Sequence, residues 1–402
     1  MDWVDSPEQA TFRAEVRALI SRELPERYRG QRQDANWQRD RRSDNPAERE
    51  AAMSWTRALA AKGWVAPHWP KQYGGAGMTP MEQFIFNEEM ARAGAPLAAS
   101  LHGVAMLGPT LIVHGTQEQR DQHLPKILSA EVVWAQGYSE PGAGSDLAAL
   151  QTRAVRDGDE YVLNGQKIWT SGANTADWLF TLVRTNPDAP KHRGISFLIA
   201  DLKTPGISVR PIINMAWGDD LNETFFEDAR VPVRNLVGEE DRGWYVGMTL
   251  LDFERSGISS AVGTQRSVRM LIDYATGEGR AQSRLADLPS LRTEVADRMI
   301  ECEVSYQFSL RIVSMQNAGL VPNYEASCAK LFNSELTQHI ARTGTKVFGL
   351  YSNLWDASDD YAPMRAAYTH TYVSSIPSTL AGGSSEIQRG IIATRGLGLP
   401  RG

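Results

Sequence analysis

A stretch near the middle of the chain brings hydroxyl groups, glycines and a large aromatic side chain close together in sequence. The turn Ser139–Asp146 reads SEPGAGSD, and Trp169 stands directly before Thr170, Ser171 and Gly172. An aromatic ring beside hydroxyls, with a glycine-rich turn upstream, suits the binding of a flat polar ring and a phosphate. The alternative is a twisted β-sheet in which the Gly, Ser and Thr residues only shape turns.

A second candidate for chemistry is a carboxylate on a predicted helix over residues 243–276. Glu254 lies four residues from both Leu250 and Ile258, at the border of an apolar stripe. A carboxylate held among apolar groups has a raised pKa and can act as a general base near neutral pH. On spacing alone, a solvated pair with Arg255 at the helix edge is the more common arrangement.

The hydrophobic pattern divides the chain into three parts that would position these residues. Up to about residue 130 the pattern is helical, with capping boxes predicted to start helices at Ser6, Thr79 and Thr116 and an apolar helix at 96–114. The next part has period two, and predicts strands at 148–156, 160–169, 177–184, 195–201, 206–213 and 223–227. Long helices then return at 243–276, 289–318 and 322–351, and a last helix begins near Ser384.

Within the predicted strands, side chains alternate between the two faces of the sheet. Lys167 and Trp169 are therefore expected on one face, and Ile168 and Thr170 on the other. Tight turns are expected where glycine follows Asp or Asn, because glycine readily adopts a positive φ; these dipeptides are at 157–158 and 164–165.

Bulk properties narrow the class of protein. A chain of 402 residues with 42% hydrophobic residues can bury a large core in two or three domains. A net charge of −6 argues against a nucleic-acid surface, and neither a membrane-spanning run nor a signal peptide is evident. Cys302 and Cys328 are expected to be reduced core thiols, which is typical of the cytoplasm. No CxxC or HExxH motif supports a metal site.

The stretch from Tyr138 to Trp169, with SEPGAGSD and then NGQKIWTS, closely resembles the acyl-CoA dehydrogenase family of flavoproteins. Four further blocks resemble the family in its own order along the chain: RGISFLI at 193–199, FEDARVP at 226–232, LDFER at 251–255 and GGSSEIQR at 382–389. The resemblance implies an α+β fold with an N-terminal helical domain over 1–130, a β-barrel domain over 131–240 and a C-terminal four-helix bundle over 241–402.

In such enzymes FAD lies between the β domain and the C-terminal helices. By resemblance, Trp169 is expected to cover the face of the flavin ring and Ser171 to approach its N5 edge. Ser384 caps the last helix, whose N-terminus favours the phosphates of FAD; a simple N-cap is compatible with that role. The FAD contacts implied by the resemblance are Gln136, Tyr138, Ser139, Gly144, Ser145, Trp169, Thr170, Ser171, Arg280, Lys346, Gly349, Ser384 and Glu386.

The resemblance implies α,β-dehydrogenation of an acyl-CoA thioester to the trans-2-enoyl-CoA. A carboxylate removes the α-proton while the β-hydrogen leaves as a hydride to flavin N5, and the thioester carbonyl is polarised by a ribityl hydroxyl and a backbone N–H. Reduced flavin then passes its electrons to an electron-transfer flavoprotein. Substrate contacts are expected at Ser145, Asp252, Arg255 and Gly382.

The position of the base departs from the commonest family pattern. The medium-chain type carries its base just before the GTSQIQR-like block, where this chain has Gly382, which can offer only its backbone N–H. A second position, used by isovaleryl-CoA and long-chain dehydrogenases, matches Glu254, directly before Arg255. The resemblance therefore makes Glu254 the expected base, with Glu386 and Glu223 as weaker candidates.

Two segments that reach FAD in the neighbouring subunit of family members also depart from the pattern. The RxxFG segment reads GEGRAQSRLAD over 277–287, so Arg280 is the expected adenine-side contact, with Arg284 behind it. The QxxGG turn becomes KVFGL at 346–350, and Lys346 is expected to pair with a phosphate where the family uses an amide.

The motifs are most similar to those of bacterial, cytoplasmic members that act on bulky acyl groups, such as steroid side chains and other branched or dicarboxylic thioesters. Some of these relatives are α2β2 heterotetramers in which one type of subunit carries base and FAD; a homotetramer or a dimer is the alternative. Two other functions stay open. One is a subunit that has lost dehydrogenation and acts as a structural partner, and the other is an acyl-CoA oxidase that hands electrons to oxygen.

Overall fold

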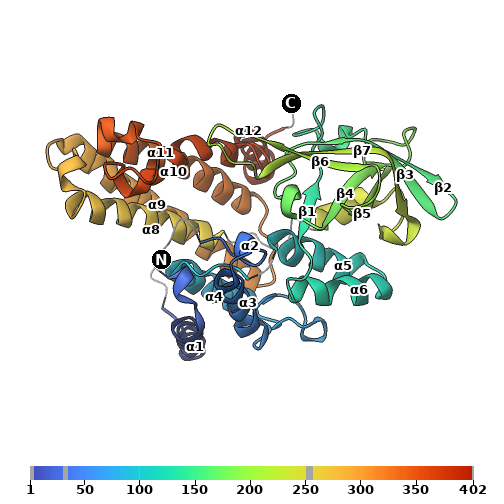
Figure 1. Ribbon diagram of the computed structural model, residues 1–402, viewed down its shortest axis with the longest axis horizontal. Helices are drawn as coiled ribbons and strands as arrows, with labels where there is room; N and C mark the ends of the chain where they lie inside the picture. Colours follow the sequence, from blue (N-terminus) through green and yellow to red (C-terminus); the bar gives the residue numbers. More distant parts are fainter. Residues whose placement is uncertain (1–3, 30–34, 99, 250–256, 401–402) are drawn as a thin grey trace. The chain divides into compact units, whose positions relative to one another are not determined.

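The computed structural model describes residues 4–29, 35–98, 100–249 and 257–400, in which the chain forms two compact units (Figure 1). Unit 1 consists of residues 1–21, 79–95 and 255–402, and unit 2 of residues 22–78 and 96–254. Unit 1 thus joins helices from both ends of the chain. The boundaries of the three consecutive domains expected from the sequence stay a prediction.

Unit 2 is built on a sheet to which the described residues contribute eight strands. The strand order is β6-β7-β3-β2-β4-β5-β8, and β1 pairs in parallel with β4. Apolar side chains fill β4 and β5, and five of the seven positions of β4 are fully buried. The strands are β1 (Trp134–Gly137), β2 (Arg153–Asp157), β3 (Glu160–Lys167), β4 (Trp178–Arg184), β5 (Ile195–Asp201), β6 (Ile207–Ile212), β7 (Leu221–Pro232) and β8 (Leu236–Val237).

The strands differ from expectation in several places: β1 and β8 were not predicted, and β3 ends at Lys167 rather than at 169. β2 starts at Arg153 rather than at 148, because residues 147–149 form a 3-10 turn, and β7 is longer than the expected 223–227. Gly158 makes the predicted turn between β2 and β3, with a φ of 62°. The dipeptide Asn164-Gly165 is not a turn but a β-bulge inside β3. A Cβ at Gly165 would lie 2.7 Å from Thr152 Cα, so the bulge exists to let two backbones approach.

The helices of unit 2 include a π-helical segment where one continuous apolar helix was expected over 96–114. Residues 102–107 form the π-helix and residues 108–114 the α-helix that follows. Gly108 stands at the junction, where a Cβ would come within 1.8 Å of the Trp69 ring, and Pro109 has no N–H to donate. The helices are α2 (Trp37–Asp40), α3 (Pro46–Ala60), η3 (His102–Leu107), α5 (Gly108–His114), α6 (Gln117–Leu128) and α7 (Gly243–Thr249).

In unit 1, the helices α8, α9 and α10 run side by side around an apolar core (Figure 1). The expected helices at 289–318 and 322–351 are confirmed within three residues as α9 and α10. No described helix is long and apolar enough to cross a membrane. The helices are α1 (Pro7–Glu23), which continues into unit 2, α4 (Pro80–Ala93), α8 (Ile258–Thr276), α9 (Pro289–Asn317), α10 (Tyr324–Phe348), α11 (Ala367–Ser374) and α12 (Ser385–Ile391).

Hydrogen-bonded caps start several of these helices as the sequence predicts. The side chains of Thr79 and Thr116 each complete a capping box, and the Ser6 hydroxyl accepts from the Gln9 amide at 3.3 Å. Short turns connect the elements: η1 (Glu26–Tyr28), η2 (Lys71–Tyr73), η4 (Leu147–Ala149), η5 (Ala173–Thr175), η6 (Val233–Asn235), η8 (Arg280–Gln282), η9 (Gly349–Asn353), η10 (Pro363–Ala366), η11 (Ile376–Thr379) and η12 (Ile392–Gly396).

Buried ion pairs fasten α1 and α9 to α4 in unit 1. Arg13 lies 2.6 Å from a Glu88 oxygen, Arg92 lies 2.7 Å from the other, and the Tyr306 hydroxyl donates to Glu88 at 2.8 Å. Burial alone would raise the pKa of Glu88, but the hydrogen bonds from Arg13, Arg92 and Tyr306 outweigh it and lower that pKa. A carboxylate with a lowered pKa stabilises the fold above its ordinary pKa of 4.5, and this stabilisation is lost as the pH falls through the lowered value.

We predict that Glu88→Gln lowers the free energy of unfolding at pH 7 by about 2 kcal/mol, because it removes a buried charged acceptor of the hydrogen bonds from Arg13, Arg92 and Tyr306. Arg13 keeps its ion pairs with Asp5 and Glu89, so this cation is not left without a partner. The difference from the unchanged protein should shrink as the pH falls below 4.5. Urea denaturation at a series of pH values measures both. Asp157→Asn is the matched control, because the Asp157–Arg230 pair is exposed and its loss costs less than about 1 kcal/mol. Equal effects of the two variants would contradict the prediction.

Candidate functional site

The glycine-rich turn after β1 is fixed to β3 by a buried ion pair. Lys167 is completely buried, and its Nζ lies 2.7 Å from Glu140 Oε1 and 3.2 Å from the Tyr138 carbonyl oxygen. The Glu140 carboxylate also accepts from the amides of Gln151 at 2.6 Å and Thr152 at 2.9 Å. The start of the turn at Ser139–Asp146 is therefore held in place by Lys167 of β3 and by the backbone at Gln151 and Thr152.

The electrostatics of this pair keep both members charged near neutral pH. Burial lowers the pKa of Lys167 to about 8, although the Glu140 carboxylate acts in the opposite direction. Burial would raise the pKa of Glu140, but Lys167 and the bonds from Thr152 and Gln151 lower it overall. Neither Lys167 nor Glu140 was predicted to be part of the site. From the sequence, Lys167 was only one position in an alternating strand. The available signal was the inward register of Tyr161, Leu163 and Lys167 along β3.

Lys167 and Trp169 do not share a face, contrary to the prediction from strand alternation. β3 ends at Lys167, and Trp169 adopts a φ of 60°, which sends its side chain to the surface with 55% of the residue exposed. Thr170 is 1% exposed, while Ser171 is exposed. A large aromatic residue in left-handed backbone is strained by about 1 kcal/mol or more, which is common at ligand sites.

The strained backbone is locked on both sides by hydrogen bonds. The Ile168 amide donates to the Ser139 carbonyl at 2.9 Å, and the Thr170 amide donates to the Asn222 carbonyl at 2.9 Å. The Asn222 side chain returns a bond to the Thr170 carbonyl at 3.0 Å. These hydrogen bonds therefore fix the backbone that carries the Trp169 ring and the Ser171 hydroxyl.

The other expected flavin contacts of unit 2 lie around the same turn. Ser139 and Gln136 are half-buried, and Gly144 and Ser145 are exposed. The Tyr138 ring packs edge-on against Phe180 in the core, and burial raises the pKa of Tyr138. The side chain of Tyr138 is thus a core residue, and its backbone remains for contact with a ligand.

In unit 1 the Gly382-Gly383 turn before α12 is held by two side chains. Lys330 Nζ donates to the Gly383 carbonyl at 2.6 Å, and Gln388 Nε2 donates to the Gly382 carbonyl at 3.0 Å. Both glycines have a positive φ, of 65° at Gly382 and 86° at Gly383. Ser384 caps α12 by accepting from the Ile387 amide at 3.4 Å, as the sequence predicts. These bonds fix the backbone at the position where the medium-chain pattern would place a base.

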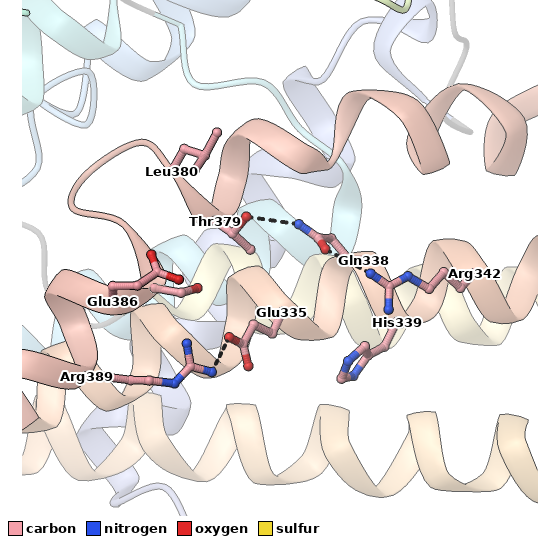
Figure 2. Close-up of a pocket in the computed structure, with 9 residues that line it drawn as sticks. Glu335, Gln338, His339, Arg342, Thr379, Leu380, Glu386 and Arg389 are labelled. Atoms are coloured by element: carbon pink, nitrogen blue, oxygen red, sulfur yellow. Dashed lines mark hydrogen bonds and ion pairs between the residues drawn. The ribbon is translucent and has the colours of Figure 1, made fainter. Parts of the chain in front are cut away.

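A cavity of about 280 Å³ opens between α10, η11 and the start of α12 (Figure 2). Its walls are strongly polar, and two hydrogen-bonded pairs cross it: Arg389 with Glu335 at 2.7 Å and Gln338 with Thr379 at 3.1 Å. The Ser385 hydroxyl in its wall is buried and finds no acceptor or donor among the described residues. The lining residues are Glu335, Gln338, His339, Arg342, Thr379, Leu380, Ser385, Glu386 and Arg389.

The residues expected to reach a neighbouring subunit's FAD lie near one end of α10. Lys346 Nζ is 3.0 Å from both oxygens of Glu294, so a carboxylate of its own chain holds this cation. Gly349 adopts a φ of 55°, and a Cβ there would lie 2.8 Å from the Arg284 side chain. Arg280 is exposed in η8. Lys346 was expected to pair with a phosphate, but in the structure it pairs with Glu294.

Three residues with expected roles in catalysis or substrate binding lie outside the described residues: Glu254, Asp252 and Arg255. The described candidate residues form two separate groups, one in each unit. Unit 2 has the Trp169–Ser171 surface and the turn after β1, and unit 1 has the Gly382–Glu386 segment with its cavity. The sequence identified the Trp169–Ser171 and Gly382–Glu386 segments, but it did not predict the cavity residues that α10 contributes, because they are distant from Glu386 in the chain.

Three family models describe the chain from residue 6 to residue 397. They are the N-terminal, middle and C-terminal domains of acyl-CoA dehydrogenases, which match residues 6–131, 135–229 and 241–397. The acyl-CoA dehydrogenase FadE26 of Mycobacterium tuberculosis is 40% identical over 85% of this chain and 86% of its own length. FadE29 of the same organism is 35% identical over 98% of both chains.

Solved structures agree with these relatives. The Tcur3481-Tcur3483 steroid ACAD has a TM-score of 0.84 with 34% identity and covers the full length of both chains. The ChsE4-ChsE5 complex from Mycobacterium tuberculosis has a TM-score of 0.79 with 35% identity, also over both full chains. The chain therefore belongs to the acyl-CoA dehydrogenase family of FAD-dependent oxidoreductases, and the expected α+β fold is confirmed.

The described residues fit FAD in both units. In unit 2, the exposed Trp169 ring with the Ser171 hydroxyl beside it suits a flat polar ring. In unit 1, the unpartnered Ser385 hydroxyl and the Arg342 guanidinium group suit the sugar and phosphate portion of a dinucleotide, while Arg389 is paired with Glu335.

We predict that Trp169→Ala lowers the affinity for FAD about tenfold, because stacking on an aromatic ring contributes roughly 1 kcal/mol beyond simple burial. Titration of the apoprotein with FAD measures the change. Trp217→Ala is the matched control, since Trp217 is also an exposed indole of unit 2 with a φ of 60°. An unchanged affinity in the Trp169 variant would remove the stacking role.

The two glycines before α12 should respond differently to alanine. At Gly383 a Cβ would lie 2.7 Å from Gln388 Nε2 and displace it, whereas at Gly382 it would meet no described atom within 4 Å. Both variants carry the strain of a positive φ, about 1 kcal/mol. We therefore predict that Gly383→Ala lowers the unfolding temperature more than Gly382→Ala, as differential scanning calorimetry would show. The opposite order would mean that Gln388 does not hold the turn.

Proposed function

We propose that the chain dehydrogenates a bulky acyl-CoA thioester to the trans-2-enoyl-CoA, with Glu254 as the base that removes the α-proton. One observation carries the assignment of the base. The turn where medium-chain relatives carry a carboxylate has Gly382 instead, while LDFER places a glutamate directly before Arg255. Bound FAD supplies the acceptor for the β-hydrogen, which leaves as a hydride.

The fixed backbone at Gly382 gives the thioester a second contact. Lys330 and Gln388 hold the carbonyls of Gly383 and Gly382, so the turn does not need to reorganise when a ligand arrives. The Gly382 N–H is then a preorganised donor for the thioester carbonyl. Such a donor makes the α C–H more acidic, because it stabilises the negative charge that develops on that oxygen.

The other two carboxylates are less suited to act as the base. Glu386 is fully exposed, and its pKa is lowered by its own backbone amide and by the Ser384 hydroxyl, which makes it a weaker base. Glu223 on β7 accepts a hydrogen bond from Gln166 Nε2 at 2.8 Å. That oxygen is therefore already occupied by a donor of its own chain.

A steroid-derived or similarly bulky acyl group is the proposed substrate. The chain is 34% identical over its full length to a structure described as a steroid ACAD, and the base position matches the long-chain and branched-chain type rather than the medium-chain type. A polycyclic acyl group is rigid and apolar, so it is recognised by buried area rather than by hydrogen bonds.

We further propose that the protein is cytoplasmic, works as an α2β2 heterotetramer or a homotetramer, and passes electrons to an electron-transfer flavoprotein. Two similar structures each combine two differently named components, Tcur3481 with Tcur3483 and ChsE4 with ChsE5. The two cysteines are free, and burial raises the pKa of Cys302 to about 11, as suits an inert thiol in a reducing compartment.

We predict that Glu254→Gln retains FAD but reduces the rate of flavin bleaching by acyl-CoA at least about 10²-fold, because a general base contributes roughly 10²–10⁴. Anaerobic stopped-flow absorbance measures bleaching directly. Glu223→Gln and Glu386→Gln are the controls, and both should bleach at nearly the unchanged rate. Retained turnover in Glu254→Gln together with a loss in either control would move the base to that residue.

A panel of CoA thioesters from butyryl to steroid-derived tests the substrate class. We predict that the steroid-derived and branched thioesters bleach the flavin with kcat/KM at least about tenfold higher than butyryl-CoA, since each apolar group that loses its contact costs roughly 1–3 kcal/mol. The panel is measured on the chain alone and on the chain co-expressed with its neighbouring gene products. Preference for butyryl-CoA in both preparations would contradict the proposal.

A further inference from the structure

A lysine and a glutamate are buried at the turn of the proposed flavin surface. Lys167 is 0% exposed and Glu140 is 8% exposed. Moving two charges out of water costs several kcal/mol each, and apolar side chains of similar volume often stabilise a fold equally well. Stability alone therefore does not account for this pair at this place.

The pair acts at one particular carbonyl. Lys167 Nζ donates to the Tyr138 oxygen at 3.2 Å, and the residue directly after β3 uses its backbone, with Ile168 N donating to the Ser139 oxygen at 2.9 Å. Two successive carbonyls of the turn are thus bound by two successive residues of the strand end. At the first of them the donor is an ammonium group instead of an amide.

A cation on a carbonyl changes the opposite end of the same peptide. The Tyr138 carbonyl and the Ser139 N–H belong to one peptide unit, and an ammonium group that draws electron density to that oxygen makes the N–H a stronger donor. The effect is large only where water is excluded, as it is at Lys167 Nζ. The Glu140 carboxylate keeps the ammonium in place and is itself tied to the Gln151 and Thr152 amides.

We propose that Lys167, oriented by Glu140, is a positioning residue that polarises the Tyr138–Ser139 peptide and sets the strength of its N–H toward the flavin. This rests on the proposed function in one respect, namely that residues 138–139 and 169–171 face the isoalloxazine ring. A stronger donor at an edge of the ring stabilises the electron-rich reduced form more than the oxidised form. Lys167 thus raises the reduction potential of bound FAD as well as its affinity.

The test compares Lys167→Met and Glu140→Gln with Glu88→Gln in the full-length holoprotein. Glu88 is a control of matched burial, at 2% exposed, whose ion pairs lie on α1 and α4. All three variants should lower the unfolding temperature. Only Lys167→Met and Glu140→Gln should weaken FAD binding, by about tenfold, the factor that corresponds to one ordinary hydrogen bond. Lys167→Met should also shift the flavin absorbance and make the reduction potential more negative.

The outcomes separate this inference from the proposed function. Should Lys167→Met fold and show the FAD affinity, spectrum and potential of the control variant, Lys167 is only structural and the inference fails. If Lys167→Met does not fold, Glu140→Gln decides by the same affinity measurement, because Gln keeps the shape of the side chain and can still accept from one amide. The proposed function fails separately, when none of the thioesters bleaches the unchanged holoprotein.

Discussion

An ammonium group that is sealed from water must find acceptors within hydrogen-bond distance, and this constraint organises unit 2 around Lys167. Its acceptors, Glu140 and the Tyr138 carbonyl, both belong to the turn after β1. β3 ends at Lys167, beside these acceptors. At the bulge, Gly165 has no Cβ, so β3 can pass close to Thr152. Because β3 ends at Lys167, Trp169 lies two residues beyond the strand and is carried on irregular backbone.

Unit 1 uses the same principle with different groups. Lys330 and Gln388 reach the carbonyls of the Gly382-Gly383 turn, so charged or polar side chains from a helix hold an irregular backbone in a single conformation. In both units, then, the segments proposed to bind ligands are short and irregular, and each is held by side chains of a neighbouring element. Rigid support of this kind keeps reorganisation low during a reaction.

Local patterns predicted much of the fold, since capping boxes and apolar periodicity depend only on neighbours in sequence. The long helices α9 and α10 and the caps at Thr79 and Thr116 were predicted in this way. The bulge at Gly165 and the positive φ of Trp169 were not, because both arise from contacts with segments far along the chain. The candidate site shows the same limit. Its motifs identified Trp169 and Ser384, whereas a role for Lys167 can be inferred only from its contact with the Tyr138 carbonyl, which the sequence does not show.

The exposed indole of Trp169 bears on how the cell makes this protein. A newly folded chain that has not yet met its cofactor presents that ring to water, and exposed apolar surface promotes association with other chains. A ligand that binds only the folded state stabilises it by mass action, by about 2.7 kcal/mol at a hundredfold excess over its dissociation constant. The amount of intact enzyme in the cell would then follow the supply of riboflavin, even at a constant rate of synthesis.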